Sequence, residues 1–128
     1  MGIQLNLVIA WTWIVLGFLS GFALGLNFHR EDWLGGYSSY PRRLLRLGHI
    51  SFFGLGLLNA LFAVTVALVP FNELTARIAS LGLLIGAITM PLCCFASAWR
   101  KPLRVLFPIP VGSVLIGTVL VTIAFLRS

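Results

Sequence analysis

Four apolar stretches follow one another along the chain, and each is long enough to cross a lipid bilayer as a helix. A membrane-spanning helix needs about 20 apolar residues, and such runs occur at 5–26, 44–69, 74–99 and 103–126. Of the 128 residues, 59% are hydrophobic and only 9% are charged. A soluble fold of this length cannot hide so much apolar surface. The sequence therefore predicts an all-α integral membrane four-helix bundle with up-down topology, a single domain over residues 1–128.

The basic residues predict which side of the membrane each loop faces. Four spans place both termini on one side and loops one and three on the other, and loops rich in Lys and Arg stay in the cytoplasm. Seven of the nine basic residues belong to loops one and three or their helix entries: Arg30, Arg42, Arg43, Arg46, Arg100, Lys101 and Arg104. We therefore expect these loops in the cytoplasm and both termini on the non-cytoplasmic side of a bacterial inner membrane.

The sequence favours neither a cleaved signal peptide at its start nor nucleic-acid binding through its positive charge. No Lys or Arg precedes Arg30, so the first stretch lacks the basic start of a signal peptide, and we expect it to be a retained span. Membrane topology accounts for the net charge of +6. Nucleic acid is therefore not an expected partner, whereas lipids and other membrane subunits are.

Small residues at helical spacing predict close helix packing. Gly17, Gly21 and Gly25 follow at intervals of four in the first stretch, and Gly82 and Gly86 repeat the interval in the third. Such glycines line one face of a helix and let another backbone approach closely, inside the chain or in another subunit.

Two polar or helix-disrupting residues within the spans also carry expectations. Asn59 is expected to form an interhelical hydrogen bond, because an amide in the bilayer needs a partner. Pro91 is expected to kink the third stretch.

The two histidines and a sulfur-containing segment are the candidates for cofactor binding. His29 follows the first span and His49 lies in the second, so a b-type haem held by both is one hypothesis. Met90 and Cys94, near the cytoplasmic end of the third span, offer the thioether and thiolate that suit copper. Plain packing of these four side chains is the alternative interpretation.

Loop one combines basic and aromatic residues and is expected to be an ordered cap. Gly35-Gly36 predicts a turn, and Glu31 and Asp32 are expected to pair with the nearby arginines. Interfacial anchoring explains the loop most simply, and a docking surface for a partner or an anionic lipid head group is the functional alternative. The residues of this surface are Arg30, Trp33, Arg42, Arg43 and Arg46.

The sequence holds no enzyme motif, and the chain is not expected to be an enzyme by itself. In size, span count and helix-entry histidine it is similar to small anchor and accessory subunits of respiratory complexes. This likeness implies an accessory or structural subunit of a larger membrane complex in electron transfer or energy conversion. A haem- or copper-binding protein and a small oligomeric transporter are the alternatives.

Overall fold

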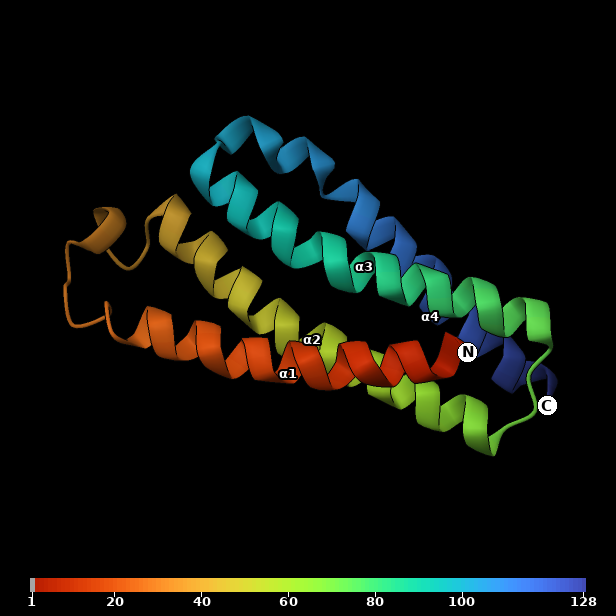
Figure 1. The fold of residues 1–128 in the computed structure, drawn as a ribbon. Coiled ribbons are helices and arrows are strands. Elements are labelled where there is room, and N and C mark those ends of the chain that lie inside the picture. Colours follow the sequence, from red (N-terminus) through yellow and green to blue (C-terminus); the bar gives the residue numbers. More distant parts are fainter. Residues whose placement is uncertain (1) are drawn as a thin grey trace.

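The computed structural model describes residues 2–128, which form four helices long and apolar enough to cross a membrane (Figure 1). They are α1 (Gly2–Gly25), α2 (Tyr40–Leu68), α3 (Glu73–Trp99) and α4 (Pro108–Arg127). Two short 3₁₀ helices, η1 (Trp33–Gly35) and η2 (Lys101–Leu106), lie in the first and third connections. The all-helical class is thus confirmed, with four helices that are long and apolar enough to cross a membrane.

The helices begin and end close to the predicted limits, and the largest difference lies at the start of α4, which begins at Pro108 and not at residue 103 because η2 occupies the preceding residues. The start of α2 also differs. This helix begins at Tyr40 and not near residue 44. Ser39 precedes it as the N-cap, and its hydroxyl accepts a hydrogen bond from the Arg42 amide at 3.4 Å. Pro41 occupies the first turn, where its missing N–H costs nothing. Arg42 and Arg43 therefore belong to the helix.

α3 is the central helix of the fold. It buries eleven residues, whereas α1 buries three and α4 buries two. α1 packs against α2 and part of α3, and α4 packs against α3 (Figure 1). Among residues 2–128, α1 and α4 share no extended contact. The arrangement is therefore an open bundle, with α1 and α4 as its flanks.

The apolar core lies where α2, α3 and α4 meet. Phe62, Ala79 and Leu83 form its buried centre, and Val114 and Val121 of α4 pack against it. The α3–α4 crossing is close because Gly82 faces the backbone of α4: a Cβ there would lie 2.6 Å from the Ser113 carbonyl oxygen.

The glycines of α1 make room for rings rather than for a backbone. Gly17 lies against the Phe53 ring and Gly21 against the His49 ring, both from α2. Gly25 has open space where a Cβ would stand. Gly86 of α3 lies beside Val114 and the Pro110 carbonyl of α4. The two predicted stripes thus meet different surfaces, because the neighbour of α1 presents large side chains at the matching positions.

Candidate functional site

A buried polar relay joins α1, α2 and α3. The Asn6 amide donates to the Asn59 side-chain oxygen at 2.7 Å, and the Ser80 hydroxyl donates to the Asn6 side-chain oxygen at 2.6 Å. The Asn59 amide donates to the Leu55 carbonyl at 2.8 Å. Asn6 and Asn59 are fully buried. The interhelical bond expected of Asn59 is confirmed, and the relay uses these polar groups to hold three helices together.

A second polar contact between helices depends on a proline. Pro91 has no N–H, so the carbonyl of Ala87 one turn earlier loses its usual helical partner. The indole N–H of Trp13 in α1 donates to this carbonyl at 2.7 Å. An unpaired carbonyl within the bilayer is costly. Helix α3 runs without a break through Pro91, and Trp13 replaces the missing bond.

The two histidines are placed differently. His29 lies exposed in the first connection. His49 is half-buried in α2, with Nδ1 3.0 Å from the Ser20 hydroxyl, which also lies 3.1 Å from the Gly17 carbonyl. Ser20 has one proton. When it donates that proton to the carbonyl, His49 donates through Nδ1 and leaves Nε2 unprotonated.

Met90 and Cys94, the residues proposed for copper, both lie on α3, and their binding of a metal stays a prediction. Within the described part of the chain, no group of three or more His, Cys, Asp or Glu side chains lies together. Cys94 is fully buried in α3, next to the buried Cys93, and both thiols are free. Met90 is half-buried. The sulfur-containing segment thus takes part in the packing of the central helix.

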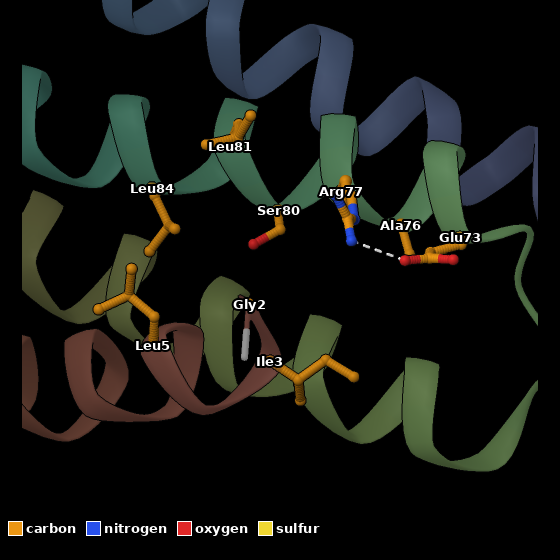
Figure 2. Close-up of a pocket in the computed structure, with 9 residues that line it drawn as sticks. All are labelled: Gly2, Ile3, Leu5, Glu73, Ala76, Arg77, Ser80, Leu81 and Leu84. Atoms are coloured by element: carbon orange, nitrogen blue, oxygen red, sulfur yellow. Dashed lines mark hydrogen bonds and ion pairs between the residues drawn. The ribbon is translucent and has the colours of Figure 1, made fainter.

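A cleft of about 510 Å³ opens between the beginnings of α1 and α3 (Figure 2). Its walls are mainly apolar, and Arg77 pairs with Glu73 at 2.7 Å on its rim. Ser80 points from α3 towards α1 in this cleft and connects it to the polar relay (Figure 2). The lining residues are Gly2, Ile3, Leu5, Glu73, Ala76, Arg77, Ser80, Leu81 and Leu84.

The opposite end of the molecule carries an ordered cap formed by loop one. The predicted turn is present: Gly35 and Gly36 have φ of 90° and 100°. Arg42 is only 2% exposed. Its guanidinium carbon lies 5.1 Å from the Phe28 ring centre and 5.6 Å from that of Trp33. The cap is thus a cage of aromatic rings around an arginine.

The expected ion pairs of loop one are absent, and this prediction was wrong. In residues 2–128 the single ion pair joins Arg77 and Glu73, at the other end of the molecule. Arg42 instead donates through Nη1 to the backbone carbonyls of Arg30 and Glu31, at 3.4 and 3.3 Å. The side chains of Glu31 and Asp32 are exposed. Water solvates exposed carboxylates well, so little is gained by an ion pair.

The basic residues of the third connection lie beside this cap. The Lys101 ammonium stands 5.0 Å from the ring centre of Tyr40, at the start of α2. Figure 1 shows the first and third connections at one end of the molecule and both termini at the other. Seven basic residues therefore gather at one end, as their positions in the sequence predicted.

Comparison of the chain with protein-family models, with curated proteins and with solved structures finds no match.

Several residues of these sites escaped the sequence analysis. Asn6 and Ser80 were missed because an amide near a helix start and a serine in a span are common and carry no sign of a distant partner. Trp13 was missed for a similar reason. The signal for Trp13 was indirect: Pro91 frees a carbonyl at Ala87, and some donor had to supply the bond.

Proposed function

We propose that this protein is an accessory or structural subunit of a larger membrane complex. The observation that carries the proposal is the outward face of α1. Trp11, Phe18 and Phe22 follow at helical spacing on this face and are each more than two-thirds exposed. Large, rigid aromatic side chains are enriched where proteins bind one another. A flanking helix that buries few of its own residues is well suited to bind a second subunit.

The hydrogen bonds of the interior agree with a structural role. Asn6, Asn59 and Ser80 satisfy one another, and Trp13 satisfies the Ala87 carbonyl. These polar groups hydrogen-bond to one another between helices. A subunit that holds its shape while presenting one helix face to a neighbour needs this kind of interior.

The process and the membrane in which the complex works are proposed from the likeness to respiratory subunits and from the distribution of charge. Electron transfer or energy conversion rests on the similarity in size, span number and helix-entry histidine. The bacterial inner membrane, with loops one and three in the cytoplasm, rests on the seven basic residues at one end of the molecule.

The experiment that tests the proposal is purification from native membranes in a mild detergent, with mass spectrometry of the proteins that remain bound. We expect stoichiometric membrane subunits to accompany the chain. Trp11→Ala and Phe22→Ala should release them, whereas Leu115→Ala, on the exposed face of α4, should not. Recovery of a monodisperse chain without any stoichiometric partner would contradict the proposal.

A second candidate function is binding of haem b through His49, favoured by the contact with Ser20. A histidine that ligates a metal commonly donates a hydrogen bond through its other ring nitrogen. In the tautomer that donates from Nδ1 to Ser20, Nε2 is left free to ligate. Protein from the native source should then show a Soret band that His49→Ala abolishes and His29→Ala, in an exposed position, retains. A colourless native protein would exclude this candidate.

A further inference from the structure

Two arginines of α2 converge on one aromatic ring at the capped end of the molecule. Arg42 and Arg46 are four residues apart and share a helix face. Their guanidinium carbons lie 5.9 Å and 3.9 Å from the centre of the Tyr37 ring. Like charges four residues apart on a helix destabilise it, and an anion that contacts both removes this cost.

The donors of these arginines are only partly used. Nη1 of Arg42 donates to two backbone carbonyls, at 3.3 and 3.4 Å. Nε of Arg42 and Nη1 of Arg46 are buried without a hydrogen-bond partner. A buried charged donor without an acceptor is unfavourable. The cage of Phe28, Trp33 and Tyr37 supplies apolar cover and cation–π contact, but no acceptor for these two atoms.

The carboxylates of the neighbourhood do not fill this role. Glu31 and Asp32 are exposed, and neither forms an ion pair with a described residue. The surroundings are otherwise basic, with Arg43 on the next position of α2 and Lys101 beside Tyr40.

We infer that Arg42 and Arg46 form a binding site for the phosphate of an anionic phospholipid. A phosphate oxygen accepts several hydrogen bonds, and guanidinium groups bind phosphate with directed donors. The site lies at the end of a membrane-spanning helix and among Trp33, Tyr37 and Tyr40, aromatic residues typical of the head-group region. Phosphate bound there would satisfy Nε of Arg42 and Nη1 of Arg46 together.

Entry to the site requires a small movement of the cap. Tyr37 covers Arg46 and is itself 68% exposed, so its side chain has room to turn away. This inference does not depend on the proposed accessory role.

The test uses the full chain, purified in a neutral detergent and titrated with phosphatidylglycerol or phosphatidylcholine of the same acyl chains. The readouts are native mass spectrometry of retained lipid and the midpoint of thermal unfolding. We expect phosphatidylglycerol to bind about tenfold more tightly and to raise the midpoint. Both lipids carry a phosphate, but the choline cation of phosphatidylcholine cancels the net charge of its head group and is repelled by the surrounding basic residues. Equal binding of the two lipids would overturn the site.

Three variants separate directed binding from general attraction. Arg46→Gln should lower the affinity for phosphatidylglycerol about tenfold, whereas Arg104→Gln, which removes an exposed charge from the third connection at the same end of the molecule, should keep it. Arg46→Lys keeps the charge over Tyr37 and is also expected to bind more weakly, because lysine lacks the planar fork. Equal losses in Arg104→Gln and Arg46→Gln, or full affinity in Arg46→Lys, would contradict the inference.

A soluble probe distinguishes the source of the phosphate. Inorganic phosphate and glycerol phosphate, at concentrations that saturate soluble phosphate sites, should neither raise the unfolding midpoint nor displace phosphatidylglycerol. If either one competes with the lipid, the ligand is a soluble phosphate and the lipid assignment is wrong.

Discussion

Pro91 in α3 leaves the carbonyl of Ala87 without a helical donor, and a side chain of α1 supplies the hydrogen bond. Pro91 cannot donate to this carbonyl, and lipid offers no water to replace the bond. Trp13 supplies the donor across the α1–α3 contact at 2.7 Å. The hydrogen bonds among Asn6, Asn59 and Ser80 have the same cause, because polar side chains in apolar surroundings are stabilised when they hydrogen-bond to one another.

Trp13→Phe should destabilise the fold by about 1–2 kcal/mol, because the Ala87 carbonyl then lacks a partner. Replacing Pro91 with Ala restores a backbone N–H for that carbonyl. In a double-mutant cycle of unfolding free energies in detergent, Trp13→Phe should therefore cost less in the Pro91→Ala background. Equal costs in both backgrounds would show that the indole contributes only its packing.

The polar relay gives a second prediction at the residue scale. Asn59→Leu keeps the branched shape of the side chain but leaves the Asn6 amide without its acceptor, so we expect a loss of about 1–3 kcal/mol in unfolding free energy. Ser80→Ala removes one bond and should cost about 0.6 kcal/mol. Thr89→Val is the control, because the Thr89 hydroxyl bonds only a carbonyl of its own helix. A loss for Thr89→Val as large as that for Asn59→Leu would contradict this account.

At the scale of helices, the lengths of the apolar stretches predicted where the helices lie, but they did not predict which neighbour each helix face contacts. Each span was found because twenty apolar residues in lipid must form a helix. The start of α2 was predicted too late, because the cap at Ser39 and not the apolar run determines it. The glycine stripes were visible in the sequence, yet the sequence contained no sign that Gly21 faces a ring and Gly82 a backbone.

The α3–α4 crossing can be tested with a matched pair of glycines. A methyl group at Gly82 would collide with the Ser113 carbonyl, which cannot move aside without shifting α4. Gly82→Ala should therefore cost about 1–3 kcal/mol of unfolding free energy through overpacking. A Cβ added at Gly112 would stand in open space, so Gly112→Ala should be neutral or stabilise by up to about 1 kcal/mol. Similar effects of both substitutions on detergent unfolding would argue against a tight crossing.

At the scale of the whole molecule, the charges in the sequence predicted which loops lie at the same end of the molecule, but they did not predict which ion pairs form. The sequence placed seven basic residues at loops one and three, and the structure brings these loops to one end. It also suggested acid–arginine pairs in loop one, where Arg42 in fact lies among rings and backbone carbonyls. Ion pairs depend on side-chain direction and on competition from water, and neither is encoded in simple proximity along the chain.

The asymmetry of charge also predicts how the molecule sits in its membrane. A cysteine introduced at Ser38, in loop one, should react with a membrane-impermeant maleimide only after the cells are permeabilised, because basic loops remain in the cytoplasm. A cysteine at Ser128 should react in intact cells, since the C-terminus lies at the opposite end (Figure 1). Both positions are exposed, and the native Cys93 and Cys94 are buried in α3, so the unsubstituted chain provides a low background. Labelling of the Ser38 position in intact cells, with protection of Ser128, would invert the topology and place the Arg42 cap outside the cell.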